Sequence, residues 1–217
     1  MRGLIVKDML VMRKTLRTYA VFLLFYLVMS ALDLFPISMT TAVIQIIIMM
    51  LPMAAFSYDE MAKWDRYAMA LPVGRRAVVG GRYCFALSLA LGAALYGLVV
   101  SVVLSILSSR ELVMENLLTV LVSLGIGLLY CDILLPLCYK LGPERARPYM
   151  YLVIFVPVIL LFGGAQLGLF DSLDLSFLDR MSQGALLGCF SLTAIIPFLA
   201  MGVSYLISCR IVEGKEF

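Results

Sequence analysis

The residue types that most enzymes and metal sites require are absent or scattered in this chain of 217 residues. It contains no His, which excludes Ser-His-Asp triads, HExxH metal sites and histidine proton relays. Its five cysteines show no CxxC spacing and fall within or beside apolar runs, so we interpret them as small apolar residues. We therefore predict no catalytic residue, no metal site and no cofactor bound by this chain.

Asp132 is the one acidic residue well inside a long apolar run, eight residues before Lys140. A charged carboxylate at the centre of a bilayer costs about 2.5 to 3.5 kcal/mol, so we expect Asp132 to be uncharged or hydrogen-bonded inside a helical bundle. Pro136 cannot donate a backbone hydrogen bond to the carbonyl group of residue 132, which predicts a kink. A coupling or gating role for Asp132 is the alternative.

The segment from Ser57 to Arg82 combines apolar and charged residues at helical spacing. Five residues at three- and four-residue spacing form one apolar face, and charged residues occupy the rest. The apolar positions are Tyr58, Met61, Trp64, Ala68 and Leu71, and the charged positions are Asp59, Glu60, Lys63, Asp65 and Arg66. Pro72 ends the helix. The pattern predicts a short helix over residues 58–72 that either lies on lipid headgroups or docks on a partner protein, and we favour docking.

The first seventeen residues alternate apolar clusters with basic residues: Arg2, Lys7, Arg13, Lys14 and Arg17. This pattern is typical of an interfacial amphipathic helix whose basic face meets anionic lipid. A helix over residues 1–17 fits a simple membrane anchor and a docking role equally well.

Long apolar stretches must position these residues, and the chain has six of them. The composition is 63% hydrophobic and only 14% charged, which is typical of a protein solvated by lipid. A helix of about 20 apolar residues spans a bilayer. The stretches lie near Thr18 to Leu32, Met39 to Ser57, Tyr83 to Leu107, Leu117 to Tyr139, Pro148 to Leu169 and Gly184 to Cys209. We predict an all-α integral membrane protein with six transmembrane helices in a single domain over residues 1–217.

The basic residues indicate how these spans are oriented. Fifteen of the seventeen Lys and Arg residues lie on one side, and only Arg110 and Arg180 lie on the other. Short loops rich in Lys and Arg stay in the cytoplasm, so we expect both termini to be cytoplasmic. The basic residues form short blocks rather than one continuous face, which argues against nucleic acid as a partner.

Two stretches resemble the small ABC-2 type transporter permeases. The first is a YDE-x3-W-D motif that begins at Tyr58 and runs into an LP pair and a basic pair. The second is LPLCYKLGPERAR at Leu135 to Arg147, which has the form P-L-x-Y-K-x-G-x-E-x-x-R. The six-span layout and the basic N-terminal segment fit the same family.

The resemblance implies a complex of two permease copies, expected to be identical, each carried on a separately encoded ABC ATPase subunit. No GxxxxGK[ST] motif occurs in this chain, so ATP and Mg²⁺ are expected on the partner subunit. The segment between the second and third spans corresponds to the coupling helix that docks on the ATPase. Its expected contact residues are Asp59, Glu60, Trp64, Asp65, Arg66, Tyr67, Leu71 and Pro72.

The permeases most similar in size and pattern belong to exporters of phenol-soluble modulins, the amphipathic peptide toxins of Gram-positive bacteria. This similarity implies a multi-pass protein of the Gram-positive cytoplasmic membrane that exports amphipathic or antimicrobial peptides. The alternative is a membrane-embedded immunity or sensor protein that binds a peptide without transporting it. A neighbouring reading frame for a P-loop ATPase favours the exporter.

Overall fold

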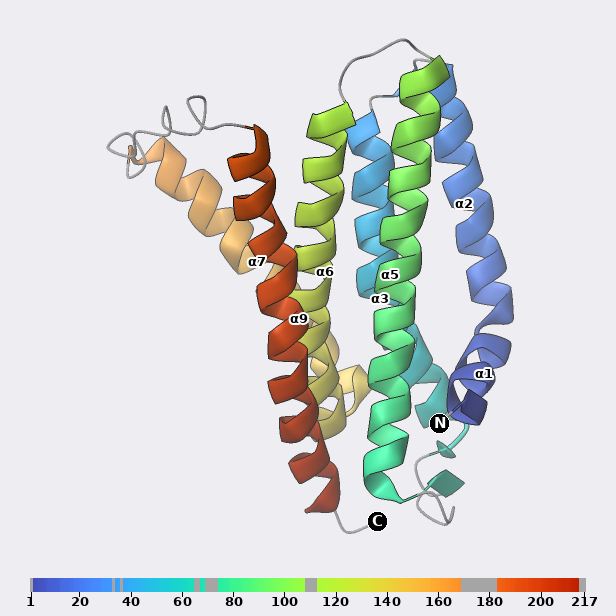
Figure 1. Ribbon diagram of the computed structural model, residues 1–217. Coiled ribbons are helices and arrows are strands. Elements are labelled where there is room, and N and C mark those ends of the chain that lie inside the picture. Colours follow the sequence, from blue (N-terminus) through green and yellow to red (C-terminus); the bar gives the residue numbers. More distant parts are fainter. Residues whose placement is uncertain are drawn as a thin grey trace.

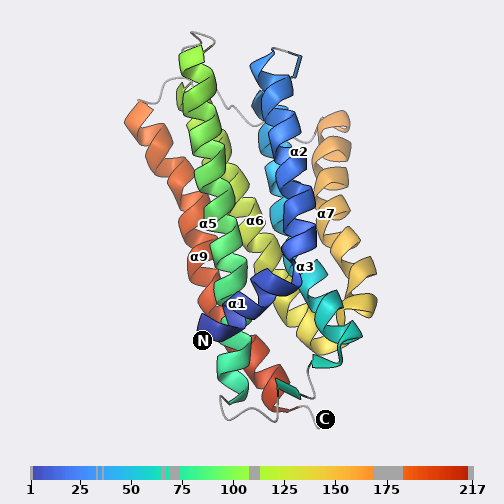
Figure 2. The same ribbon diagram turned by 90° about the vertical axis from the view of Figure 1, so that its right-hand side faces the viewer.

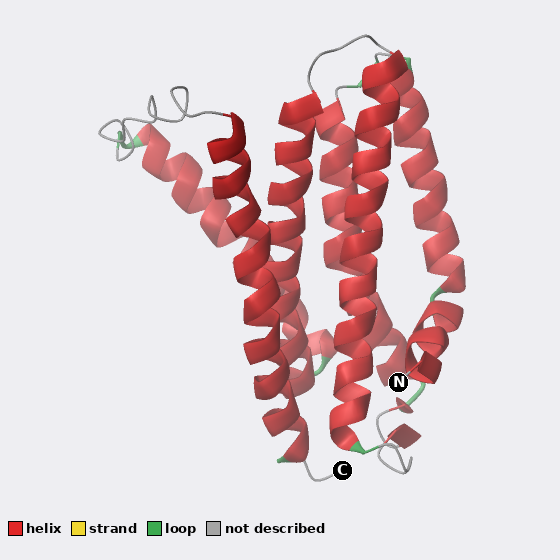
Figure 3. Ribbon diagram, in the orientation of Figure 1, coloured by secondary structure: helices red, strands yellow, loops and turns green. Residues whose placement is uncertain are grey.

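The computed structural model describes residues 2–32, 34–35, 37–64, 67–68, 74–107, 113–168 and 183–214. Within these ranges the regular structure is entirely helical, which confirms the predicted all-α class (Figures 1 and 3). The helices are α1 (Arg2–Val11), α2 (Arg13–Ala31), α3 (Ile37–Met61), α5 (Arg75–Leu107), α6 (Val113–Leu141), α7 (Pro143–Gln166) and α9 (Gln183–Glu213).

Five of the described helices are long and apolar enough to cross a membrane. The candidate spans are Val43–Met61, Arg75–Val103, Asn116–Leu141, Pro143–Gln166 and Leu187–Glu213. Apolar helices of this length satisfy their own backbone groups and expose side chains that lipid can solvate. The first predicted span lies in α2, which packs beside α3 and α5 but is not among the five. The described helices thus confirm a multi-pass membrane protein, and the sixth span stays a prediction.

Helix α6 is the centre of the bundle, because it packs against α3, α5, α7 and α9. Its side chains at Leu128, Cys131 and Leu135 are fully or almost fully buried. Helix α6 approaches α9 closely at Gly125, where a Cβ atom would lie 2.1 Å from the carbonyl oxygen of Thr193. Only a residue without a side chain permits this backbone contact.

The later half of α7 lies away from the rest of the bundle (Figures 1 and 2). The helix is anchored near its start, where Ala146 and Met150 are buried. Every residue from Phe155 to Phe162 is exposed. Eight consecutive residues cover all faces of a helix, so this part of α7 has no close neighbour among the described residues. Its apolar side chains are suited to lipid.

Helix α1 lies crosswise over the end of the bundle that carries Lys63, Arg75, Lys140 and Arg210, which we call the basic end (Figure 2). A break at Met12, a fully buried residue, separates α1 from α2. The predicted interfacial helix over residues 1–17 is therefore two pieces, because residues 13–17 form the first turns of α2. Leu4 of α1 crosses α5 so closely that its Cβ lies 3.0 Å from a Cβ atom built on Gly81.

Candidate functional site

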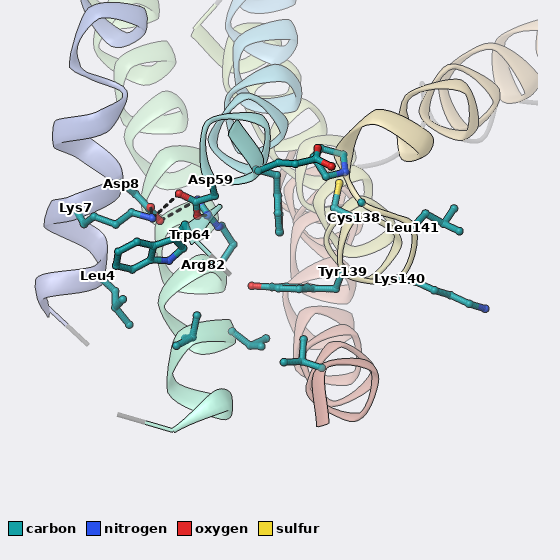
Figure 4. A pocket seen from close by; sticks show the side chains of 17 residues that line it. Leu4, Lys7, Asp8, Asp59, Trp64, Arg82, Cys138, Tyr139, Lys140 and Leu141 are labelled. Atoms are coloured by element: carbon teal, nitrogen blue, oxygen red, sulfur yellow. Dashed lines mark hydrogen bonds and ion pairs between the residues drawn. The ribbon is translucent and has the colours of Figure 1, made fainter. Parts of the chain in front are cut away.

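Four charged residues from three helices form a buried ion cluster at the basic end (Figure 4). Lys7 Nζ lies 2.9 Å from Asp8 Oδ1 and 2.7 Å from Asp59 Oδ1. Arg82 Nη1 lies 3.0 Å from Asp8 Oδ2, and Arg82 Nη2 pairs with Asp59 Oδ2. The ion cluster therefore contains two positive and two negative groups, and each carboxylate has one oxygen facing each cation.

Burial makes this pairing necessary. The side chains of Asp8, Asp59 and Arg82 are 5%, 9% and 6% exposed, and an isolated charge at such depth is strongly unfavourable. The planar guanidinium of Arg82 suits the task, because its two terminal nitrogens can bind carboxylates from two different helices. Phe56 also faces this guanidinium, with its ring centroid 4.7 Å from Arg82 Cζ. The ion cluster thus links α1, α3 and α5.

The segment that follows α3 lies over the ion cluster. Lys7 Nζ is 4.3 Å from the ring centroid of Trp64, within the range of a cation–π contact. Trp64 in turn contacts Tyr67, with 5.3 Å between ring centroids. Tyr67 and Met61 are 61% and 82% exposed. This part of the chain therefore presents apolar and aromatic surface outward while its inner face rests on charged groups.

A cavity of about 230 Å³ separates the ion cluster from the corner between α6 and α7 (Figure 4). Its walls include Trp64, Tyr139 and Gly142. Glu60 also lines the cavity, and its Oε1 lies 3.7 Å from a Cβ atom built on Gly142, the residue before α7. An acidic group near the start of a helix is stabilised by the helix dipole. The cavity lies where all of the described helices except α2 meet.

The structure describes some of the predicted docking residues and not others. Glu60 and Tyr67 are exposed, and Trp64 is partly exposed. Asp59 has other partners than the expected ATPase, because its carboxylate points inward to Lys7 and Arg82. The remaining predicted contacts lie outside the described residues: Asp65, Arg66, Leu71 and Pro72.

The structure also changes the expected boundary of this segment. Helix α3 continues through Tyr58 and ends at Met61, so residues 58–61 belong to a transmembrane helix. Lys63 then adopts a positive φ of 50°, an uncommon conformation for a residue with a side chain that marks a turn. Helical structure resumes at Trp64 and includes residues 67–68. Periodicity alone could not locate this turn, because the apolar spacing continues across it.

Lys7 of helix α1 does not face lipid as the sequence suggested. Lys7 and Asp8 face the ion cluster, while Val6, Met9 and Leu10 are exposed. The prediction of a basic lipid-facing surface is thus wrong for Lys7, although the basic residues of the next helix are exposed: Arg13, Lys14 and Arg17. The physical reason is that Asp59 supplies a buried partner that lipid cannot match.

The intramembrane carboxylate also differs from expectation. Asp132 is buried, but neither of its carboxylate oxygens has a hydrogen-bond partner among the described residues. One of the two predicted alternatives, a hydrogen-bonded Asp132 side chain, is therefore wrong for this structure, and an uncharged Asp132 stays a prediction. Its backbone carbonyl instead accepts a hydrogen bond of 2.6 Å from Ser204 Oγ. Helix α6 continues through Pro136 to Leu141 without ending.

Sequence reasoning missed several residues of the ion cluster and of the contact at Asp132. Lys7 and Asp8 form an adjacent pair of opposite charge, and Arg82 stands at the start of a long apolar run. A charge at the edge of a span usually needs a partner, so these three positions carried a usable signal. No such signal marked Ser204, because serine is common in membrane helices and the hydrogen-bond partner of Ser204 is a backbone carbonyl group.

These features define a class: a multi-pass helical membrane protein whose basic end presents an aromatic segment supported by buried ion pairs. The chain belongs to the ABC-2 family of transporter proteins, whose family model, described as "ABC-2 family transporter protein", matches residues 3–213. Membership implies a permease that works with an ABC ATPase in a membrane. No curated protein and no solved structure matches the chain.

Proposed function

We propose that this chain is the permease subunit of an ATP-driven ABC exporter. The match to the ABC-2 family over residues 3–213 carries the proposal, because it covers the helices that are apolar enough to cross a membrane. The sequence has no P-loop motif, so ATP and Mg²⁺ bind a separately encoded ATPase. The permease itself contributes the translocation pathway for the substrate and the surface on which the ATPase docks.

The proposed topology has six spans, with both termini in the cytoplasm. Helix α2 serves as the first span: its 19 residues extend about 28 Å, close to the thickness of a hydrocarbon core. Its outward apolar side chains, including Val21, Phe22, Leu24 and Phe25, are suited to lipid. The basic end then faces the cytoplasm, in agreement with the positive-inside rule.

The ATPase docks on the aromatic segment at the basic end in this proposal. Tyr67 and Met61 are exposed and apolar, and Trp64 is only partly covered. Aromatic side chains that are buried on association contribute much of the binding energy of protein interfaces. The ion cluster beneath Trp64 holds this side chain in place from inside, which lowers the cost of ordering it when the ATPase binds.

The proposed substrates are amphipathic or antimicrobial peptides, and the complex contains two copies of this permease in a Gram-positive membrane. The support for this substrate class is the similarity of the chain in size and pattern to the permeases of phenol-soluble modulin exporters. The substrate class is thus the most detailed part of the proposal, and it needs a measurement of its own.

The test is reconstitution with the ABC ATPase encoded beside this chain. The two proteins are co-expressed, purified together and placed in lipid nanodiscs and in vesicles loaded with ATP. An exporter is expected to retain the ATPase, to hydrolyse ATP faster when a phenol-soluble modulin is added, and to transport the peptide. An ATPase with a substituted P-loop lysine serves as the control. Peptide binding without ATPase association would favour the immunity or sensor alternative.

A further inference from the structure

We use the name docking segment for the stretch around Trp64 on which the ATPase is proposed to dock. We propose that the ion cluster is a mechanical joint that makes α1, α5 and the docking segment move as one unit. This inference rests on the proposed function, because it assumes that an ATPase moves the docking segment. Asp59 lies two residues before α3 ends at Met61, and Lys7 contacts Trp64 of the docking segment directly. Any displacement of this segment therefore acts on the ion cluster within one helical turn.

The joint reaches α1 through two adjacent side chains. Lys7 and Asp8 each bridge to another helix, Lys7 to Asp59 and Asp8 to Arg82, at 2.7 and 3.0 Å. Leu4 is one turn earlier in α1 and packs on Gly81, the neighbour of Arg82. Helix α1 is therefore held to α5 by an ion pair and by a close apolar contact.

The joint also leads to the first predicted span. Met12 is fully buried between α1 and α2, and Leu16 of α2 donates its backbone N–H to the Met12 carbonyl at 2.8 Å. The break between the two helices is thus a packed corner rather than a free linker. A displacement of α1 is therefore expected to shift α2 as well.

Charged groups are suited to such a joint. Ion pairs near 3 Å in a buried site lose much of their energy when they separate, because the charges are then left without solvent. Apolar side chains could slide past each other at lower cost, since the hydrophobic effect is not directional. The ion cluster therefore resists separation of the three helices during a movement of the whole unit.

A charge-balanced variant cuts this joint with the least damage to folding. Lys7→Gln/Asp8→Asn removes one positive and one negative group and leaves the Asp59–Arg82 pair intact. At ATPase concentrations that saturate binding despite the lost Lys7–Trp64 contact, we expect the complex to hydrolyse ATP, while transport per ATP falls about tenfold, an effect usual for energetic coupling between sites. The matched control is Glu144→Gln/Arg147→Gln, an exposed pair at 3.1 Å, which should transport like the wild type.

A disulfide between α1 and α5 provides the decisive second part of the experiment. Cysteines at residues 4 and 81 would have Cβ atoms near 3.0 Å, slightly closer than the range of about 3.5 to 4.5 Å that disulfides prefer. The substitutions Leu4→Cys and Gly81→Cys are added to the charge-balanced variant with Cys84→Ser, because Cys84 is exposed one turn from Gly81. Oxidation should restore transport per ATP at least in part, and reduction should lower it again.

The outcomes separate the joint from the proposed function. If the wild-type chain neither binds nor stimulates the ATPase, the proposed function and this inference are both overturned. If the wild type couples normally and Lys7→Gln/Asp8→Asn transports like it, only the joint is overturned. Transport that stays low after the disulfide has formed also overturns the joint, since a restored tie between α1 and α5 should suffice.

Discussion

The Ser204 hydroxyl donates a hydrogen bond of 2.6 Å to the Asp132 carbonyl oxygen, the helical acceptor that Pro136 leaves free in α6. Ser204 has only one proton, so Tyr83 must donate to Ser204 Oγ at 2.7 Å, and Ser208 must donate to the Tyr83 hydroxyl at 2.8 Å. The resulting chain of hydrogen bonds runs from Ser208 in α9 to Tyr83 in α5, returns to Ser204 in α9 and ends at the carbonyl group in α6. All three hydroxyl-bearing residues are buried.

Loss of the Ser204 hydroxyl is expected to destabilise the protein. Ser204→Ala leaves the Asp132 carbonyl without its donor, and an unsatisfied buried acceptor costs about 1 to 3 kcal/mol. Thermal unfolding in detergent measures the effect. Ser191→Ala is the control, because Ser191 only donates to the Gly188 carbonyl on an exposed turn. In a Pro136→Ala background the loss should shrink, since residue 136 can then donate to the same carbonyl; an equal loss in both backgrounds would contradict this account.

The close contact of α6 with α9 should make Gly125 intolerant of any side chain. Gly125→Ala places a methyl group 2.1 Å from the Thr193 carbonyl oxygen, so the helices must separate. Overpacking of this kind costs about 1 to 3 kcal/mol. Gly92→Ala in α5 is the matched control, because nothing lies within 4 Å of its Cβ position. Both variants are compared by thermal unfolding; similar melting temperatures would show that the two helices are farther apart than described.

Removal of Arg82 should be far more damaging than removal of another arginine in the same helix. Arg82→Gln leaves Asp8 and Asp59 sharing one lysine in a buried site, and breaking a buried ion pair costs about 3 to 5 kcal/mol. Arg76→Gln removes only an exposed pair with Glu213, which should leave the unfolding temperature unchanged. Equal effects in a thermal unfolding assay would mean that water reaches the ion cluster.

Trp64 is predicted to anchor the ATPase. Trp64→Ala should weaken association by about 2 kcal/mol or more, because aromatic anchors dominate interfaces and rim charges contribute little. Lys63→Ala, one residue away and exposed, should leave association unchanged. Binding of the two purified subunits measures both. If Trp64→Ala binds normally, and Cys probes at residues 60–67 crosslink only to lipid, the segment lies on the membrane and the docking assignment is falsified.

Neutralisation of Asp132 should be tolerated. Its carboxylate is buried without a hydrogen-bond partner among the described residues, so a charge there is more unfavourable than a neutral amide group. Asp132→Asn is expected to leave unfolding temperature and ATPase association unchanged. Transport is the discriminating measurement: an assembled complex that no longer transports would assign Asp132 a coupling role.

The sequence by itself determined the membrane class and most of the helices. Apolar stretches such as Leu117 to Tyr139 exceed the length that a bilayer requires, and no other environment solvates so many apolar side chains. It also indicated the free carbonyl before Pro136 and the aromatic segment around Trp64, because each depends on residues within one or two helical turns.

Only the tertiary structure decided which charges meet. Asp59 lies 52 residues from Lys7 and 23 from Arg82 along the chain, and no periodicity within one helix reports their approach. The same packing placed Ser204 beside the Asp132 carbonyl and left the Asp132 carboxylate without a hydrogen-bond partner in the described part of the chain. Local pattern reveals which face of a helix avoids water, whereas the identity of a buried partner depends on how separate helices cross.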